Sequence, residues 1–219
     1  MKNIIKAKKN NYPSKNNYPS IFSKMIKNNK VISTLFTGVG GQGILLATSI
    51  IARACLYEGL DVKVTEVHGM AQRGGSVVGS VRFGKKVFSP LISRADIIIA
   101  LEKLESLRYI DDLNDKGIII VNDYEILPVS IFDNNYKKYE YPYDVEKQLK
   151  KFTNNVFIIN ALDIAKNLDN IKTMNIILLG YLSNFLPIKK QNWISSINKI
   201  LPKKLVDLNL KAFEIGSKF

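Results

Sequence analysis

The chain has 219 residues, of which 46% are apolar, and this is enough to build one hydrophobic core in one domain. No apolar run approaches the roughly 18–20 residues of a membrane-spanning helix, and the first 30 residues lack the apolar segment of a secretory signal. We therefore expect a soluble, cytoplasmic protein with no membrane partner. The net charge of +13 suggests a nucleic-acid partner at first sight, but its distribution argues against one.

Residues 1–30 hold much of that charge. They carry eight lysines and no acid, so the remaining 24 basic residues face 19 acidic ones, an excess of about +5. The segment also repeats NNYPSK as NNYPSI within Asn- and Lys-rich sequence of low hydrophobicity. We expect a disordered extension over 1–30, followed by a single domain over 31–219, and no nucleic-acid partner.

From residue 31 onward, short β-branched or apolar runs alternate with helical patterns. Strands are expected at 31–38, 61–67, 76–83, 85–90, 95–102, 117–122 and 156–160, with Gly84-Lys85 as a tight turn. Helices are expected at 41–58, 103–113, 174–186, 191–201 and 205–219. This order predicts an α/β fold: a Rossmann-like, doubly wound, mostly parallel sheet with a helical C-terminal part.

A glycine-rich loop joins the first strand to the first helix. Gly38, Gly40 and Gly43 match G-x-G-x-x-G, with Gly41 and Gln42 between them. Glycine permits a tight turn and close approach, and the free N–H groups of a helix N-terminus attract an anion. The loop is therefore a candidate phosphate site, although close strand–helix packing alone would also explain its glycines.

A second loop follows the strand at 61–67. The sequence EVHGMAQRGGS, residues 66–76, contains the only histidine of the chain. Arg73 can clamp a carboxylate or phosphate, Gln72 and the N–H groups of Gly74 and Gly75 can orient a carbonyl or anion, and His68 can transfer a proton near neutral pH. A structural histidine is the simpler alternative. Both loops leave carboxyl ends of strands, where ligands bind in open α/β sheets, so we expect them to line one crevice.

The remaining candidate residues are explained by structural roles. Cys55 lies in an apolar helical pattern and is expected to be a buried structural thiol. A single cysteine cannot supply the four thiolates of an iron–sulfur cluster. Glu102 and Asn122 end strands, where solvated or capping roles are favoured over a place in the crevice. Glu105 and Arg108 share a helical face with Glu102.

Together, GVGGQGILLA, EVHGMAQRGGSVVGSVRFG, SPLISRADIIIALEKLE and GIIIVN resemble the small beta/gamma-type subunits of 2-oxoacid:ferredoxin oxidoreductases. The order and spacing are most similar to the indolepyruvate group of that family. The resemblance covers residues 31–217 and is least clear over 128–155. The long, chemically unusual EVHGMAQRGGS stretch makes it far more specific than the glycine motif alone.

The resemblance implies a Rossmann-like subunit without clusters, packed against a large alpha subunit that carries thiamine diphosphate and 4Fe–4S clusters. The complex would decarboxylate an arylpyruvate, reduce ferredoxin and transfer the acyl group to coenzyme A. It implies that the 38–43 loop holds a coenzyme A phosphate or another anion. It also implies that the loop from His68 to Ser76 closes the substrate crevice, with Gln72 and Arg73 contacting the oxoacid, a cofactor phosphate or the alpha subunit.

Two alternatives stay open. One keeps the enzyme class and changes the substrate to pyruvate, 2-oxoisovalerate or 2-oxoglutarate. The other is a standalone nucleotide-binding regulator, which Glu66 favours because an acid at the end of the second strand is typical of ribose recognition.

Overall fold

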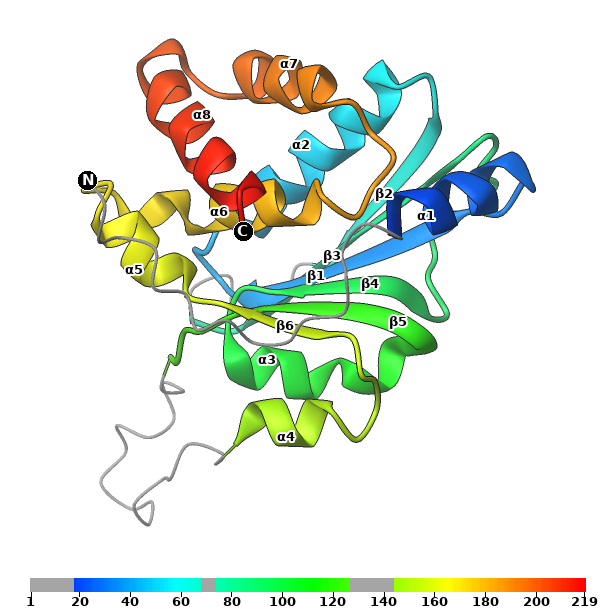
Figure 1. The fold of residues 1–219 in the computed structure, drawn as a ribbon, viewed down its shortest axis with the longest axis horizontal. Helices are drawn as coiled ribbons and strands as arrows, with labels where there is room; N and C mark the ends of the chain where they lie inside the picture. Colours follow the sequence, from blue (N-terminus) through cyan, green and yellow to red (C-terminus); the bar gives the residue numbers. More distant parts are fainter. Residues whose placement is uncertain (1–17, 68–73, 127–143) are drawn as a thin grey trace.

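The computed structural model describes residues 18–67, 74–126 and 144–219. Its centre is a six-stranded sheet in the order β2-β3-β1-β4-β5-β6 (Figure 1). The strands are β1 (Ile32–Val39), β2 (Asp61–Val67), β3 (Ser76–Gly84), β4 (Ala95–Ala100), β5 (Leu113–Asn122) and β6 (Val156–Ile159). β1, β4, β5 and β6 run parallel, whereas β3 runs antiparallel to both of its neighbours. The predicted Rossmann-like, mostly parallel α/β sheet is confirmed, with a hairpin at one edge.

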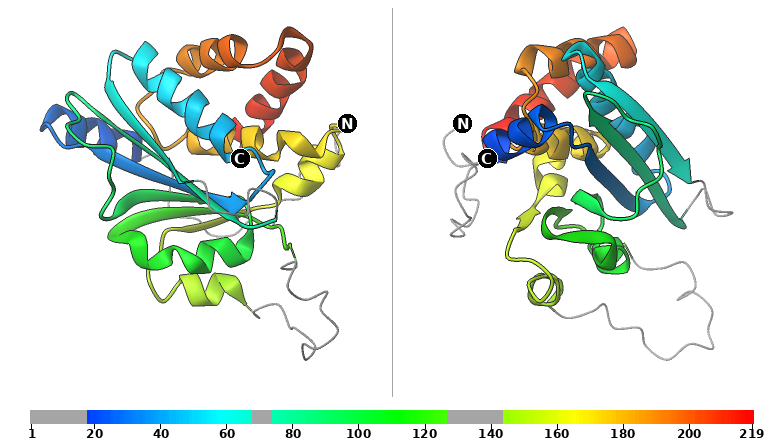
Figure 2. Two further views of the ribbon diagram at one scale, coloured as in Figure 1. Left: turned by 180° about the vertical axis from the view of Figure 1, so that it is seen from behind. Right: turned by 90° about the vertical axis from the view of Figure 1, so that its right-hand side faces the viewer.

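Helices cover both faces of the sheet and form two layers of unequal size. Figure 1 shows α3 (Lys103–Arg108) and α4 (Val145–Leu149) on one face, and Figure 2 shows the same layers from behind. The opposite layer contains α1 (Tyr18–Lys27), α2 (Ile44–Tyr57), α5 (Ala161–Lys166), α6 (Met174–Leu182), α7 (Lys190–Ile200) and α8 (Lys203–Ser217). Among the described residues, no helix combines the length and apolarity needed to cross a membrane.

Each face of the sheet has its own hydrophobic cluster. Ile97 and Ile99 of β4 belong to the cluster under the larger helical layer, whereas Ile98 and Ala100 belong to the cluster under α3 and α4. Successive side chains of a strand point to opposite faces, so a central strand buried on both sides reads as a continuous apolar run. This explains why the sequence ADIIIA identified β4 so clearly.

The expectation of a disordered extension is wrong for residues 18–30. Residues 18–27 form α1, whose Phe22 is buried, and the hydroxyl of Tyr18 donates to Asn155 Oδ1 at 2.8 Å. Apolar side chains at helical spacing (Phe22, Met25 and Ile26) pack against the core between exposed lysines. The lysine-rich composition hid this short amphipathic pattern. Residues 1–17 lie outside the described residues.

The predicted strand at 85–90 is also wrong. After β3 the chain forms an irregular segment, residues 85–94, which belongs to no strand of the described sheet and which we call the strap. Side chains of β2 and β3 bind its backbone and hold it against the hairpin. Arg82 donates to the carbonyls of Ser89 and Leu91, and Asp61 accepts from the N–H of Val87. Another difference is that β5 begins at Leu113, a residue expected in the preceding helix.

Glycines bring α6 and α8 into close backbone contact. A Cβ placed on Gly216 of α8 would meet the carbonyl oxygen of Ile177 and lie 2.9 Å from its carbonyl carbon. A Cβ placed on Gly180 of α6 would similarly meet the carbonyl oxygen of Phe213. The two helices therefore approach each other over surfaces without side chains, which fixes their separation.

Cys55 is fully buried in α2, as its apolar surroundings predicted. Burial, together with the nearby charge of Glu58, raises the pKa of its thiol well above the usual value. The thiolate is the nucleophile, so native Cys55 reacts only in molecules that have unfolded. A free energy of unfolding of about 5 kcal/mol leaves fewer than about one molecule in 10³ unfolded, and we therefore expect alkylation by iodoacetamide at pH 8 to be at least ~10³-fold slower than in denaturant. Timed mass spectrometry with and without urea measures this, and comparable rates would contradict the buried placement.

Candidate functional site

The two predicted loops start at the same edge of the sheet. Val39 at the end of β1 is paired with Ser76 at the start of β3, and Val67 at the end of β2 is paired with Val78. The N–H of Gly40 donates to the carbonyl of Gly75 at 2.8 Å, which joins the glycine loop directly to the second loop. The described ends of the two loops therefore lie side by side, whereas residues 68–73 of the second loop lie outside the described residues.

The glycine loop needs glycine at two positions for conformational reasons. Gly41 has φ = 101° and Gly43 has φ = 80°, in the left-handed region that side chains disfavour. Gly43 is also the N-cap of α2, where a Cβ would collide with the amide of Asn175. Glycine therefore turns the chain from β1 into the 14-residue helix α2 within a few residues.

The side chain of Gln42 holds the loop in this shape. Its Oε1 accepts from the N–H of Val39 at 2.7 Å, and its Nε2 donates to the carbonyl of Leu101 at 3.0 Å. The same carbonyl accepts from Asn122 Nδ2 at 3.2 Å. Gln42 was predicted to bind a cofactor; in this structure its amide ties the loop to Leu101, directly after β4.

Backbone donors remain in the turn of the loop. The N–H groups of Gly41 and Gly43 have no acceptor among the described residues, although that of Gln42 donates to the carbonyl of Val39. On the other side of the loop, Asn175 Nδ2 donates to the carbonyl of Gly43 at 3.1 Å. Free N–H groups beside the positive end of a helix dipole are suited to an anion such as a phosphate.

A buried polar cluster centred on Glu105 lies beneath this edge. Its carboxylate accepts from the hydroxyl of Ser76, from Thr37 Oγ1 at 3.3 Å and from Arg108 Nε at 3.2 Å. The Tyr109 hydroxyl lies 3.3 Å from Ser76 Oγ. The side chain of Glu105 is only 5% exposed, whereas that of Arg108 is 55% exposed. Glu105 thus connects the end of β1 with the start of β3, the two strands that carry the loops.

Sequence reasoning missed this cluster. Glu105 and Arg108 were recognised as sharing a helical face, but nothing in the local sequence indicates that a hydroxyl from β1 and another from β3 meet the carboxylate. The capping interpretations hold for the neighbouring residues. Glu102 caps α3 by accepting from the N–H of Glu105 at 2.9 Å, and Asn122 Oδ1 accepts from the N–H of Ala161 at 3.0 Å.

Three predicted catalytic residues, His68, Gln72 and Arg73, lie outside the described residues. Of the second loop, the structure describes Gly74, with φ = 78°, and Gly75 and Ser76 beyond it. In the described ranges, no cluster of three or more His, Cys, Asp or Glu side chains could hold a metal.

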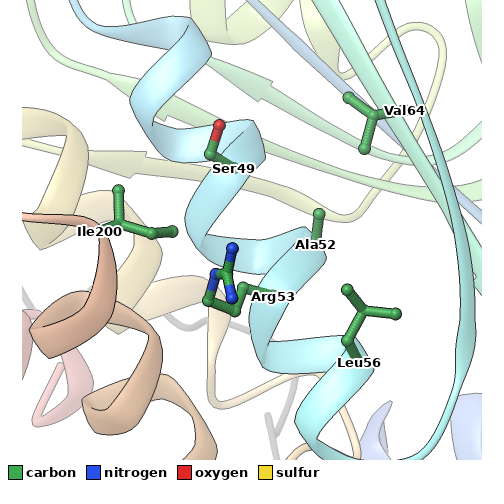
Figure 3. Close-up of a pocket in the computed structure, with 6 residues that line it drawn as sticks. All are labelled: Ser49, Ala52, Arg53, Leu56, Val64 and Ile200. Atoms are coloured by element: carbon green, nitrogen blue, oxygen red, sulfur yellow. The ribbon is translucent and has the colours of Figure 1, made fainter.

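A surface groove of about 560 Å³ lies away from the glycine loop, along the middle and C-terminal part of α2 (Figure 3). Its lining comes from α2, β2 and α7: Ser49, Ala52, Arg53, Leu56, Val64 and Ile200. The groove contains none of the predicted site residues. It therefore does not replace the sheet edge as the candidate site.

The topology also separates this site from a dinucleotide site. In a dinucleotide fold the second strand neighbours the first, so that its terminal acid reaches the ribose. Here the antiparallel β3 lies between β1 and β2, which places Glu66 two strand spacings, roughly 10 Å, from β1. The order of the strands therefore differs from that of a nicotinamide dinucleotide fold.

Comparison with known proteins gives the family. The sequence model of the pyruvate ferredoxin/flavodoxin oxidoreductase family matches residues 33–219, and the chain belongs to that family. Indolepyruvate oxidoreductase subunit IorB of Archaeoglobus fulgidus is 39% identical over 84% of this chain and 93% of its own length. IorB of Thermococcus kodakarensis is 36% identical over 86% and 96%.

Solved structures share the fold. The gamma subunit of a keto/oxoacid ferredoxin oxidoreductase from Geobacter sulfurreducens superposes with a TM-score of 0.67 at 24% identity, over 86% of this chain and 95% of that one. A 2-oxoglutarate:ferredoxin oxidoreductase from Magnetococcus marinus, solved with 2-oxoglutarate, coenzyme A and succinyl-CoA bound, superposes with a TM-score of 0.66 at 19% identity. That match covers 86% of this chain and 30% of the other.

Proposed function

We propose that the chain is the small subunit of an indolepyruvate ferredoxin oxidoreductase, which oxidises arylpyruvates to aryl-acetyl-CoA and passes two electrons to ferredoxin. One observation carries the choice of substrate. Relatives named for indolepyruvate are 34–39% identical over 92–96% of their lengths, whereas ketoisovalerate and 2-oxoglutarate relatives aligned over similar stretches of this chain are 26% identical. The preference among 2-oxoacids rests on this difference.

The proposed reaction needs a larger partner subunit. Its one cysteine is buried with a raised thiol pKa, so it does not fit the ligand set of a 4Fe–4S cluster. Thiamine diphosphate and the clusters would belong to an alpha subunit, which supplies decarboxylation and electron transfer. This chain would contribute binding, orientation and exclusion of water at the shared crevice.

The glycine loop is the proposed contact for coenzyme A. The N–H groups of Gly41 and Gly43, which have no acceptor among the described residues, fit a phosphate oxygen. Gly38, at the end of β1, leaves room for the Gln42 side chain that shapes the loop, and Gly40 would lie beside the phosphate. Gly74, Gly75 and Ser76 would extend the same surface. His68, Gln72 and Arg73 would face the oxoacid carboxylate, a cofactor phosphate or the alpha subunit.

The experiment is an anaerobic assay of the complex purified through a tag on this chain. We expect a brown, thiamine-containing partner and coenzyme A-dependent reduction of methyl viologen, fastest with indolepyruvate among the four 2-oxoacids. If pyruvate, 2-oxoisovalerate or 2-oxoglutarate is turned over fastest, the enzyme class stands and that 2-oxoacid replaces indolepyruvate as the substrate. A colourless chain that purifies alone and binds NAD would contradict the proposal.

A further inference from the structure

One buried side chain from the first turn of α6 supports the start of α2. Asn175 is 3% exposed, and its Nδ2 donates to the carbonyl of Gly43 at 3.1 Å. The same carbonyl accepts from the N–H of Ala47 at 3.0 Å, as in a regular helix. Glycine at position 43 makes room for the amide, since a Cβ there would collide with it. Asn175 therefore contacts the backbone at the point where the glycine loop becomes a helix.

This contact acts on the direction of the donors at the helix start. In a trans peptide group the carbonyl of Gly43 and the N–H of Ile44 point in opposite directions. The carbonyl points along α2 toward Ala47, so the N–H of Ile44 points out of the N-terminal end. Among the described residues this N–H has no acceptor, like those of Gly41 and Gly43. Fixing one carbonyl therefore directs a third donor to the end of α2 that suits an anion.

Stability alone does not explain the side chain of Asn175. Its Oδ1 is buried and has no hydrogen-bond partner in the described part of the chain. A buried acceptor without a partner destabilises a fold by more than one neutral hydrogen bond stabilises it. The carbonyl of Gly43 would also remain paired with the N–H of Ala47 if the amide were removed. Folding therefore gains little from an asparagine here, and we look for its role at the site.

The segment that carries Asn175 is itself held in place. Just before α6, Thr173 is 1% exposed, and its hydroxyl donates to the carbonyl of Asn170 at 2.8 Å. At the first residue of α6, Met174 Sδ lies 3.6 Å from Nδ2 of the fully buried Asn122, at the end of β5. The amide of Asn175 is therefore presented from a fixed support, which a residue that positions another group requires.

We propose that Asn175 is a positioning residue for the phosphate that the glycine loop binds. Its amide holds the peptide group between Gly43 and Ile44, so that the N–H of Ile44 joins those of Gly41 and Gly43 beside the phosphate. Asn175 acts through this backbone and does not itself contact the ligand. The inference rests on the proposed function, because coenzyme A is the phosphate-bearing substrate in that reaction. It adds to the site a residue 132 positions away from Gly43 along the chain.

The test compares coenzyme A with pantetheine, which has the same thiol and no phosphate, on the complex purified through a tag on this chain. Anaerobic titration calorimetry should show that Asn175→Ala raises the dissociation constant for coenzyme A by about fivefold to tenfold. Asn175→Asp keeps the shape, removes the donor and places a carboxyl group near the phosphate, so its effect should be at least as large. With pantetheine as the acyl acceptor, kcat/KM of both variants should stay within about twofold of the wild-type value.

The matched control is Asn209→Ala, in α8. Asn209 is 6% exposed and its Nδ2 donates to the carbonyl of Leu205 at 2.7 Å, so this variant also removes a buried amide that binds a backbone carbonyl. It should leave the dissociation constant for coenzyme A unchanged. The pantetheine comparison keeps the test decisive even if a variant loses part of its stability, because a folding defect lowers the rate with both acceptors.

The outcomes separate the positioning role from the proposed function. If Asn175→Ala binds coenzyme A as tightly as the wild-type complex does, the positioning role is overturned, even when that complex oxidises indolepyruvate. An equal rise in the dissociation constant with Asn209→Ala overturns it as well, and so does an equal loss of rate with pantetheine. Failure of the assembled wild-type complex to use any 2-oxoacid refutes the proposed function instead, while calorimetry with coenzyme A still decides the role of Asn175.

Discussion

Replacing Gly216 with alanine is expected to lower the free energy of unfolding by about 3 kcal/mol. The added methyl group would meet the backbone carbonyl of Ile177 on α6, and a backbone cannot rotate away as a side chain can. The helices α6 and α8 would have to separate, which loosens the contacts that bury Phe213 and its neighbours.

Two effects of this substitution oppose each other. Alanine is favoured over glycine inside a helix by roughly 1 kcal/mol, so the variant would be more stable if the methyl group found space. Overpacking a close contact costs typically 1–3 kcal/mol, and more when the obstacle is backbone. We expect the steric effect to dominate because the contact is with backbone atoms on the facing helix.

Urea unfolding followed by circular dichroism and by the fluorescence of Trp193 measures this change. A loss of about 3 kcal/mol corresponds to a fall in melting temperature of about 6–12 °C for a chain of this size. Lys211→Ala, at an exposed position of α8, is the control and should change stability by less than about 0.5 kcal/mol. Equal midpoints for the two variants would show that the helices tolerate the methyl group.

Glu105→Ala is the second substitution with a large expected effect, a loss of about 2–4 kcal/mol. Thr37 is fully buried and the hydroxyl of Ser76 is partly buried, and both donate to the carboxylate that this change removes. Arg108 loses its ion pair too, but its exposed guanidinium can turn to water, so this part of the loss is small. The unpaired buried hydroxyl and the cavity account for most of the effect.

Glu105→Gln separates the hydrogen bonds from the charge. The glutamine keeps the shape and one oxygen acceptor, so we expect it to restore most of the stability lost in Glu105→Ala. Asp111→Ala removes an exposed acid close to the cluster and serves as the control, with an expected change below about 0.5 kcal/mol. If Glu105→Ala unfolds at the same urea concentration as Asp111→Ala, the cluster contributes nothing measurable.

The sequence predicted the features that depend on neighbours along the chain. The apolar run of β4 and the passage from β1 through three glycines into α2 were predicted because periodicity, chain reversal and helix starts are encoded locally. The same locality explains the error at the N-terminus. The average composition of residues 1–30 is that of a disordered segment, and the few apolar residues of α1 become significant only against the core that they cover.

Other features could not be predicted because they depend on strand order. An alternation of strands and helices favours parallel neighbours, so the placement of the antiparallel β3 between β1 and β2 was not anticipated. That placement brings Ser76 beside Thr37 and both within reach of Glu105, residues that are 29 and 68 positions away along the chain.

The hairpin has a consequence for the length of the connection between β2 and β3. This connection joins two strands of one antiparallel ladder, whose described end carries the pair Val67–Val78 and the hydrogen bond from Gly40 to Gly75. The entropy of closing a flexible loop grows only with the logarithm of its length, so a connection twice as long would cost only about 0.6 kcal/mol more. A right-handed crossover between parallel strands has no such freedom, because its helix must span the sheet and pack on it. The connection between β2 and β3 can therefore accept insertions and deletions more easily than the three helical connections β1–β2, β4–β5 and β5–β6.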